Sequence, residues 1–393
     1  MIEVILMAFI VSSWIFWLLA TVAVYQFFRR PQKWDAGFTP PVSILKAVKG
    51  IDAFAYENFA SFCKLDYPEY ELLFGVAEAS DPVIPLVQQL QRDFPQRRIR
   101  LYVTPPLGPN RKASILHYLA GQAQYEILVA SDSDMRVRPD YLRRVVAPLA
   151  DPRVGLVTCP YRGRQALSLP AHLEALHMSV TFIPSVIVAR LVLPISPPMG
   201  ASMAMRRRDL EQAGGFAAVA DYLADDYQIG AHIASLGLSV HLSDYIMDSV
   251  LGETVFDDQW YREVRWMRCA RMSRPLEYPA MVLTFSTPLA LVLLFVSGFD
   301  FWGWLALVIS AFLRWGIGWL LTGWVSDLES RPWLLWLPVR DMLSAATWCA
   351  AAFGRRVFWR GEEFRLVAGG RLEPVASAEA APVGVAGPPK HGT

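Results

Sequence analysis

An uncharged apolar segment at the start of the chain limits its fold more than any other feature. Residues 4–28 contain no charged side chain, and about 20 apolar residues in a helix suffice to cross the hydrocarbon core of a bilayer. One charged side chain, Glu3, precedes the segment, whereas basic residues cluster just after it. A cleaved secretory signal carries its basic residues before the apolar run. We therefore predict a retained transmembrane anchor at residues 1–30, with the next domain in the cytoplasm.

A second apolar block covers residues 278–354 and is expected to form a C-terminal membrane region. Two spans are predicted in it, at residues 279–296 and 301–324. The stretch 333–353 forms either a third span or a re-entrant helix. We favour the re-entrant helix, because it keeps the basic residues that follow in the cytoplasm. The residues that interrupt this stretch are Pro338, Arg340 and Asp341.

The composition excludes several classes of protein. The chain has 37 Lys and Arg residues and 36 Asp and Glu residues, a net charge of +1, which argues against a generally basic nucleic-acid binder. Charged residues make up 19% of the chain, whereas about 25% is typical of soluble domains. The four cysteines include no C-x-x-C pair, so neither a disulfide framework nor a zinc site is expected. Residues 368–393 are rich in Ala, Gly, Pro and Val, which predicts a disordered tail.

The middle of the chain, residues 40–275, has a different pattern. Short runs rich in Val, Ile and Leu alternate with stretches whose apolar residues recur at the helical period. This alternation predicts an α/β domain with a mostly parallel sheet covered by helices on both faces. The predicted strands are residues 42–48, 71–77, 99–103 and 127–131, and the predicted helices are residues 54–64, 83–94 and 113–120.

Polar residues follow three of these strands, at the sheet edge where ligands of such domains bind. Asp52 follows the first strand, Glu78 the second, and Asp132-Ser133-Asp134 the fourth. Two carboxylates this close together can face one divalent cation, and Mg²⁺ or Mn²⁺ would be completed by substrate phosphates and water. A helix cap or an Asx turn is the alternative interpretation of this triplet. Neither G-x-G-x-x-G nor a Walker sequence is present, so an NAD domain or a P-loop ATPase is not supported.

Five motifs in the same order resemble the ceramide glucosyltransferase family. Members of that family are membrane-bound, inverting glycosyltransferases with a GT-A fold. The C-terminal motif of this chain is similar to the branch associated with hopanoid biosynthesis in bacteria. The five motifs are Lys49-Gly50-Ile51-Asp52, Leu65-Asp66-Tyr67-Pro68, Asp132-x-Asp134, Asp225-Asp226-Tyr227 and Arg262-x-x-Arg265-Trp266, and the C-terminal one is Phe358-Trp359-Arg360-Gly361-x-x-Phe364-Arg365.

The resemblance implies a role for each matching residue on the donor side of the site. Asp52 would lie near the nucleotide, Glu78 would contact uracil, and Lys112 would help to hold the nucleotide. Asp132 and Asp134 would bind the metal–diphosphate unit, with Mg²⁺ or Mn²⁺ as the cofactor and a UDP-sugar as the donor.

On the acceptor side, the resemblance makes Asp226 the catalytic base. From sequence alone the neighbouring Asp225 is an equal candidate, and an N-cap role for the pair is the ordinary alternative. Arg262, Arg265 and Trp266 would complete the site from a helix at residues 258–275. We expect this helix to lie at the membrane surface, with its later arginines facing anionic headgroups.

The expected function is transfer of glucose or N-acetylglucosamine from a UDP-sugar to a lipid hydroxyl, with inversion. The lipid would be ceramide-like or a hopanoid polyol, and residues 194–205 are expected to line the sugar or acceptor pocket. The alternatives are a processive polysaccharide synthase and a non-catalytic nucleotide-binding membrane protein. We expect a multi-pass protein of the cell inner membrane with no nucleic-acid partner, and the sequence does not decide the oligomeric state.

Overall fold

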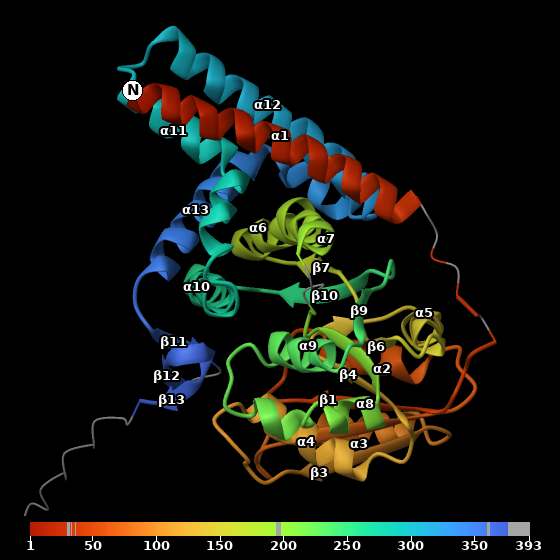
Figure 1. The fold of residues 1–393 in the computed structure, drawn as a ribbon. Helices are drawn as coiled ribbons and strands as arrows, with labels where there is room; N and C mark the ends of the chain where they lie inside the picture. The colour runs from red at the N-terminus through yellow and green to blue at the C-terminus, as the bar shows by residue number, and fades with distance from the viewer. Residues whose placement is uncertain (30–31, 33, 36, 194–197, 360–361, 376–393) are drawn as a thin grey trace, which may run out of the picture.

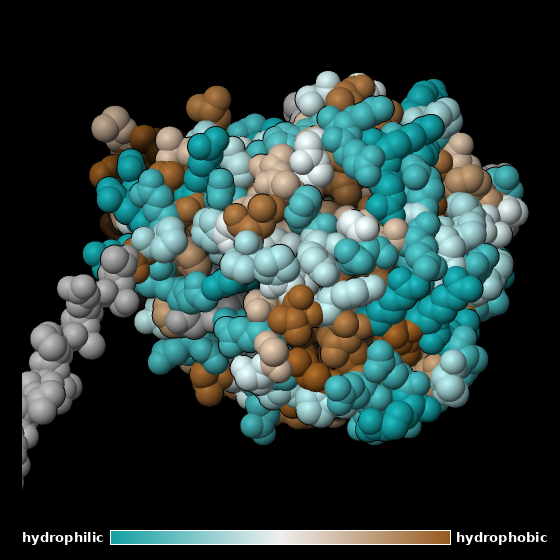
Figure 2. Space-filling model, turned by 90° about the horizontal axis from the view of Figure 1, so that it is seen from below, coloured by the Kyte–Doolittle hydropathy of each residue, from teal (hydrophilic) through white to brown (hydrophobic). Residues whose placement is uncertain are grey.

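The computed structural model describes residues 1–393 except 30–31, 33, 36, 194–197, 360–361 and 376–393 (Figure 1). In this view apolar helices lie at the top, a layer of helices and a small sheet lies beneath them, and the main sheet lies at the bottom. The face turned away from the apolar helices is mostly hydrophilic, with a small apolar cluster (Figure 2). The two ends of the molecule therefore suit different surroundings.

The main sheet has seven strands in the order β3-β2-β1-β4-β8-β6-β9. The first four strands in the chain pair in parallel, as predicted, whereas β8 runs antiparallel to β4 and β6. β2 and β4 are buried along their whole length, which is why both are rich in apolar residues in the sequence, although β2 also buries Glu71. The strands are β1 (Val42–Ala47), β2 (Tyr70–Val76), β3 (Arg98–Val103), β4 (Ile127–Ser131), β6 (Val154–Thr158), β8 (Ser202–Arg206) and β9 (Ser239–Leu242).

Helices cover both faces of this sheet, and each face has its own apolar core. One core is built around Phe59 and Phe74, and the other around Leu116 and Met205. The predicted α/β architecture with a mostly parallel sheet is thus confirmed. The helices that cover the sheet are α2 (Ala55–Cys63), α3 (Ile84–Asp93), α4 (Arg111–Gln122), α5 (Tyr141–Val146), α8 (Arg207–Gln212) and α9 (Asp225–Ser235).

A second, three-stranded sheet lies between the main sheet and the apolar helices (Figure 1). An interrupted helix, Leu169–Val192, and the arginine-rich helix α10 lie next to it. The interrupted helix contains one π-helical turn, which is often found at functional sites. The elements of this layer are β5 (Met135–Arg136), β7 (Tyr161–Ala166), β10 (Met247–Gly252), α6 (Leu169–His177), η2 (Met178–Phe182), α7 (Ile183–Val192) and α10 (Phe256–Ser273).

Three helices of the described chain are long and apolar enough to cross a membrane: Ile2–Arg29 (α1), Leu169–Val192 and Phe301–Trp324 (α12). The first and third match predicted spans. The second was not anticipated from the sequence. The predicted span at 279–296 is a bent pair of helices, η4 (Tyr278–Thr284) and α11 (Ser286–Val296), with an angle of 79° between them. Together they are apolar enough for one broken span or a re-entrant loop. Pro288 accounts for the break, because a residue without an N–H is tolerated only in the first turn of a helix.

The stretch after α12 forms η5 (Leu328–Trp336) and α13 (Leu337–Ala352), and the charged residues of α13, Arg340 and Asp341, are buried and paired. Arg340 binds both carboxylate oxygens of Glu263 on α10, at 2.7 and 2.6 Å. Arg314 of α12 lies 2.9 Å from Asp341 and 3.7 Å from the centre of the Trp17 ring. These charges therefore fix α13 against its neighbours, and in Figure 1 α13 descends from the apolar helices towards α10.

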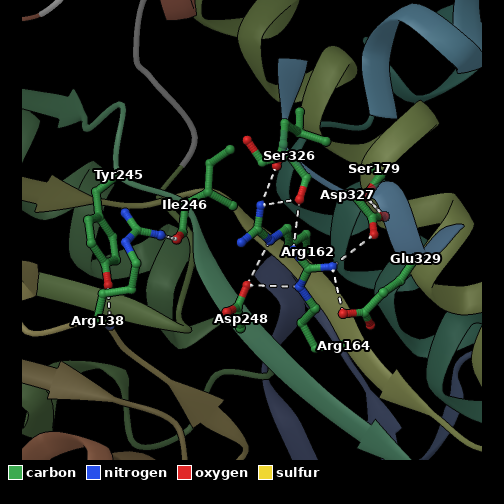
Figure 3. Close-up of polar contacts among 11 residues, drawn as sticks. Arg138, Arg162, Arg164, Ser179, Tyr245, Ile246, Asp248, Ser326, Asp327 and Glu329 are labelled. Atoms are coloured by element: carbon green, nitrogen blue, oxygen red, sulfur yellow. Dashed lines mark hydrogen bonds and ion pairs between the residues drawn. The ribbon is translucent and has the colours of Figure 1, made fainter. Parts of the chain in front are cut away.

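Two arginines of β7 attach the small sheet to the turn after α12 (Figure 3). Arg162 donates to the carbonyl oxygens of Val325 and Ser326 at 2.5 and 2.7 Å. Arg164 pairs with Asp327 at 3.4 Å and with Glu329 at 3.1 Å. The layer above the main sheet is thus held to the apolar helices by charge-assisted hydrogen bonds, which are stronger than neutral ones.

The C-terminal segment departs from the predicted disorder. Residues 356–359, 362–366 and 372–374 form a three-stranded antiparallel sheet, hereafter the C-terminal sheet. The disordered tail predicted from residue 368 onward is wrong for 368–374, because Leu372 is buried against Leu223 and Leu366. Residues 376–393 lie outside the described part of the chain. The elements are β11 (Arg356–Trp359), β12 (Glu362–Leu366), η6 (Ala368–Gly370) and β13 (Leu372–Pro374).

We predict that Arg340→Met destabilises the protein by about 3–5 kcal/mol, because it leaves the Glu263 carboxylate buried without its cation. The melting temperature in detergent measures this loss. The double variant Arg340→Met/Glu263→Met removes both charges and is expected to melt close to the parent. A single variant as stable as the parent would show that the pair does not hold α10 to α13.

Candidate active site

The predicted acidic residues lie at the edge of the main sheet where its parallel strands end. Asp52 follows β1, Asp132 and Asp134 follow β4, and Asp226 lies in the first turn of α9. The loop that enters β8 brings Gly200 to the same place. Four segments that are distant in the sequence therefore meet at one edge, where ligands of α/β sheets bind.

The Asp132-Ser133-Asp134 turn is fixed on two sides. The Ser133 hydroxyl donates to the Asp52 carboxylate. The Ser249 hydroxyl on β10 donates to Asp134 Oδ2 at 3.2 Å. The short strand β5 begins directly after the turn, so the alternative of a helix cap is wrong here.

Lys112 connects the turn to the acidic pair of α9. Asn110 caps α4 by accepting a hydrogen bond from the Ala113 N–H at 2.9 Å, and the helix then places Lys112 in its first turn. Lys112 Nζ lies 2.5 Å from Asp132 Oδ1 and donates to the Gly200 carbonyl at 3.2 Å. The Gly200 N–H in turn donates to Asp226 Oδ2 at 2.8 Å. One continuous polar chain thus runs from Asp132 to Asp226.

Gly200 allows this close arrangement because it has no side chain. A Cβ atom at this position would lie 3.1 Å from Asp226 Oδ2 and 3.2 Å from Lys112 Nζ. The neighbouring Met199 exchanges two backbone hydrogen bonds with the Thr158 hydroxyl, at 2.9 and 3.0 Å. Residues 194–197 of the predicted pocket loop 194–205 lie outside the described residues. Within the rest of the loop, Gly200 contacts Lys112 and Asp226.

Asp225 and Asp226 have different surroundings, although they are adjacent in the chain. Asp226 is partly exposed, and its Oδ1 accepts a hydrogen bond from the Tyr227 N–H at 2.7 Å. Asp225 is buried, and among the described residues its Oδ2 has no hydrogen-bond partner. The N-cap of α9 is Ala224, so neither carboxylate occupies the capping position. Of the two, Asp226 is the one that a substrate can reach.

Burial raises the pKa of both carboxyl groups. For Asp225 the pKa rises to about 6. The Lys112 ammonium opposes this rise in both residues, because a nearby positive charge favours the ionised carboxylate. Burial disfavours the charged form of Lys112 itself, but Asp132 and Asp225 outweigh it and raise the pKa of Lys112. Lys112 therefore favours the ionised form of the acidic residues, and they favour its protonated form.

A second lysine, Lys46, was missed by the sequence analysis. It is fully buried in β1, and its Nζ donates to the Asp132 carbonyl at 2.8 Å and to the Ser131 hydroxyl at 3.3 Å. The ammonium lies 3.6 Å from the centre of the Phe62 ring. Burial lowers the pKa of Lys46 to about 7, although nearby acidic residues oppose the change. One signal was available in the sequence: Lys46 is the one charged residue in a short strand that is otherwise uncharged.

Glu78, the predicted uracil contact, is exposed in the loop after β2. Its backbone carbonyl accepts a hydrogen bond from the Asp81 N–H at 3.2 Å. Asp81, which the sequence analysis did not select, accepts hydrogen bonds from the Gly50 N–H at 3.0 and 3.1 Å. Asp81 therefore shapes the loop that carries Asp52, and no described contact joins Glu78 to the acidic centre.

The arginine-rich helix α10 makes its contacts within the protein. Arg262 pairs with the buried Glu174 of α6 at 2.5 Å, and Arg265 lies 5.5 Å from the centre of the Trp359 ring. Trp266 is half-buried. Arg271 donates to the carbonyls of residues 352 and 354, and Arg268 to those of 353 and 356. These two guanidinium groups are thus engaged inside the molecule, contrary to the expectation that they face anionic headgroups.

The acidic residues fit a divalent cation that is shared with a substrate. The described residues contain no cluster of three His, Cys, Asp or Glu side chains able to hold a metal ion by themselves. Asp132 and Asp134 supply two carboxylates at one turn, and Mg²⁺ is commonly held by one or two carboxylates together with substrate phosphates. The donor set therefore suits Mg²⁺ or Mn²⁺ bound together with a diphosphate.

The chain is similar to known proteins over most of its length. The family model described as glycosyl transferase family 21 matches residues 2–372. Ceramide glucosyltransferase 1 of Caenorhabditis elegans is 24% identical over 358 residues, which cover 88% of this chain and 76% of the relative. Beta-monoglucosyldiacylglycerol synthase of Synechocystis sp. is 29% identical over 118 residues, which cover 30% of this chain and 24% of the relative.

A solved structure has the same fold. Mannosyltransferase PcManGT from Pyrobaculum calidifontis, in complex with GDP-Man and Mn²⁺, superposes with a TM-score of 0.53 at 19% identity. The match covers 89% of this chain and 99% of the mannosyltransferase. The GT-A fold expected from the sequence is confirmed.

We predict that Lys112→Met makes stability depend more steeply on pH. A carboxyl whose pKa in the folded protein exceeds its unfolded value of about 3.9 favours folding below that value. This contribution is lost as the pH rises through the folded pKa, which is about 6 for Asp225. Removing Lys112 raises that pKa further, so the loss relative to the parent grows with pH.

The measurement is thermal unfolding in detergent between pH 4 and pH 8. We expect a deficit of about 1–2 kcal/mol near pH 7.5, since both partners of the ion pair are partly exposed, and almost none near pH 4. Arg111→Met, an exposed neighbour in the same helix, is the control and should show a small, pH-independent change. A deficit in Lys112→Met that does not change with pH would contradict the assigned role.

Proposed function

Because the chain belongs to glycosyl transferase family 21, we propose that it transfers a sugar from a UDP-sugar to a hydroxyl group of a membrane lipid, with inversion at the anomeric carbon. The observation that carries the proposal is the polar chain Asp132–Lys112–Gly200–Asp226 at the carboxyl edge of the sheet. It places groups suited to a diphosphate beside a carboxylate suited to an acceptor hydroxyl.

On the donor side, Asp132 and Asp134 would hold Mg²⁺ or Mn²⁺, with Asp52 near the nucleotide. The metal would stabilise the negative charge that develops on the departing diphosphate. Lys112 supplies a fixed positive charge on the same side, and a preorganised charge of this kind favours a transition state over its ground state. Its contacts with Asp132 and Gly200 keep the ammonium within the site.

On the acceptor side, Asp226 accepts the proton of the attacking hydroxyl. Its two backbone hydrogen bonds, from Gly200 and Tyr227, orient the carboxylate. The raised pKa brings it nearer to neutral pH, which suits a general base. A single base and attack from the side opposite the leaving group give inversion.

A lipid acceptor is supported by the position of the site. Met199, next to the glycine that binds Asp226, packs into the same apolar cluster as residues of α1, α7 and α12. Tyr161 of β7 packs against the main-sheet core and against this cluster, with its ring 5.1 Å from Phe182. The acidic centre thus adjoins the apolar helices, and two relatives are named for making glycolipids.

The finer assignments follow the resemblance. We propose glucose or N-acetylglucosamine as the sugar and a ceramide-like lipid or a hopanoid polyol as the acceptor. Arg262, Arg265 and Trp266 would support the site from α10. The protein would lie in the cell inner membrane with the GT-A domain in the cytoplasm, since Arg29 ends α1 on that side.

The proposal is tested by incubating membranes that contain the protein with radiolabelled UDP-glucose or UDP-N-acetylglucosamine, each with ceramide or with bacteriohopanetetrol. We expect one pairing to give a labelled lipid, in a reaction that chelation of divalent cations abolishes. Label in a high-mass polymer would identify a processive synthase. Absence of label at every metal concentration would indicate a nucleotide-binding protein without turnover.

We predict that Asp226→Asn lowers the transfer rate by about 10²–10⁴-fold, the usual contribution of a general base, while UDP binding stays within about threefold. Asp225→Asn is the matched control. It changes the buried neighbour, so we expect a smaller loss of rate. Titration calorimetry with UDP and Mg²⁺ gives the affinity, and the labelled-lipid assay gives the rate. If Asp225→Asn loses more activity than Asp226→Asn, the base is Asp225.

A further inference from the structure

The C-terminal sheet pairs with the loop that leads into the acidic pair. Leu372 N–H donates to the Asp221 carbonyl at 2.7 Å, and Leu223 N–H donates to the Gly370 carbonyl at 3.1 Å. Between these bonds, Tyr222 and Arg371 form an antiparallel bridge, and Arg371 Nε donates to the Tyr222 hydroxyl at 3.2 Å. The loop at residues 221–223 therefore forms an isolated antiparallel β-bridge to residues 370–372, where β13 begins, and it ends two residues before Asp225.

The C-terminal sheet is itself held by the catalytic domain and α10. Leu223, Leu366 and Leu372 belong to one small buried cluster, against which Cys269 and Met272 of α10 pack. The carbonyls that enter the sheet, at residues 352–356, accept hydrogen bonds from Arg268 and Arg271. These arginines are the later members of the arginine series in α10, and the protein uses them to anchor the segment after α13.

The opposite side of the same loop is held by α4. Asn110, the N-cap of that helix, donates from its side chain to the Tyr222 carbonyl at 2.8 Å. Its backbone N–H donates to the Ala220 carbonyl at 2.8 Å. Lys112 is two residues further along the chain. The loop is thus clamped between the helix that carries Lys112 and the C-terminal sheet.

The interface between the loop and the C-terminal sheet is closely packed. The cavity bounded by Leu223, Gln228, Cys269 and Gly370 has a volume of about 10 Å³. That space holds about one water molecule. It is too small for a substrate, so the contact serves to position the loop and is not a ligand site.

We propose that the C-terminal sheet is a positioning element for the catalytic base: by pairing with residues 221–223 it sets the position of Asp226 relative to Lys112 and Gly200. The inference rests on the proposed function, in which Asp226 is the base. In this proposal, the segment after the membrane helices affects the rate of sugar transfer. Small displacements of a catalytic group are costly, and about 1 Å can lower a rate by roughly 10²-fold.

Two deletions test the proposal in the full membrane protein. Deletion of residues 370–393 removes β13 and both hydrogen-bond partners of the loop, whereas deletion of 376–393 leaves the C-terminal sheet whole. We expect the longer deletion to lower kcat at least tenfold while the Kd for UDP stays within threefold. The shorter deletion should match the parent in both.

A point variant separates pairing from general stability. Leu372→Pro removes the N–H that binds Asp221, whereas Leu372→Ala keeps it and removes most of the buried side chain. We expect kcat to fall further in Leu372→Pro than in Leu372→Ala, with UDP affinity retained in both. If UDP affinity falls in step with kcat in Leu372→Pro and in the longer deletion, the sheet supports the whole domain and the proposal is wrong.

Hydrogen–deuterium exchange supplies a readout that does not depend on transfer. Residues 220–228 should exchange faster in the longer deletion and in Leu372→Pro than in the parent. Unchanged exchange there, or parental kcat in the longer deletion, overturns the proposal. If the parent transfers no sugar, the proposed function fails, while exchange still decides whether the sheet holds the loop.

Discussion

The crowding of carboxylates at the end of the main sheet is the constraint on which the rest of the structure depends. Asp52, Asp132, Asp134, Asp225 and Asp226 approach one another from different segments. Like charges about 4 Å apart repel by about 4 kcal/mol even at a moderate effective dielectric constant. The chain offsets this repulsion with two lysines, one beneath the Asp132 turn and one between that turn and α9.

The two lysines differ in what they can contribute to function. Lys46 is fully buried in β1 and donates a hydrogen bond to the backbone carbonyl of Asp132. It therefore stabilises the conformation of the turn. Lys112 is partly exposed and touches both halves of the centre, so it can also meet a substrate phosphate. A single helix cap, Asn110, fixes Lys112 and the loop before Asp226 together. The geometry of donor and acceptor groups therefore depends on the same few contacts.

The fold could be predicted wherever the local pattern of apolar and polar residues determines the structure. Continuous apolar strands alternating with amphipathic helices led to the mostly parallel sheet, and polar residues at strand ends led to Asp52, Asp132 and Asp134. The Leu169–Val192 helix was missed because it is broken by a π-helical turn and contains Glu174 and His177. Those polar side chains are buried by neighbours such as Arg262 that only the tertiary structure reveals.

The remaining errors share that cause. Leu372 lies in a segment whose Ala, Gly, Pro and Val content suggested disorder, and its burial depends on Leu223, a partner distant in the sequence. Asp81 was not selected from the sequence, because its hydrogen bond from the Gly50 N–H depends on backbone geometry that composition does not encode. Lys46 was not selected from the sequence, because its burial follows from the position of its strand between two others. Sequence patterns identified the acidic residues of the candidate site, whereas long-range packing determines which side chains hold them in place.

The most direct test of this account is a structure of the full chain determined with UDP and Mn²⁺, in which anomalous scattering locates the ion. The account predicts Mn²⁺ on Asp132 and Asp134, the diphosphate on the side of Lys112, and Asp226 without a metal contact. Mn²⁺ held by other residues, or UDP bound away from the carboxyl edge of the main sheet, would contradict it.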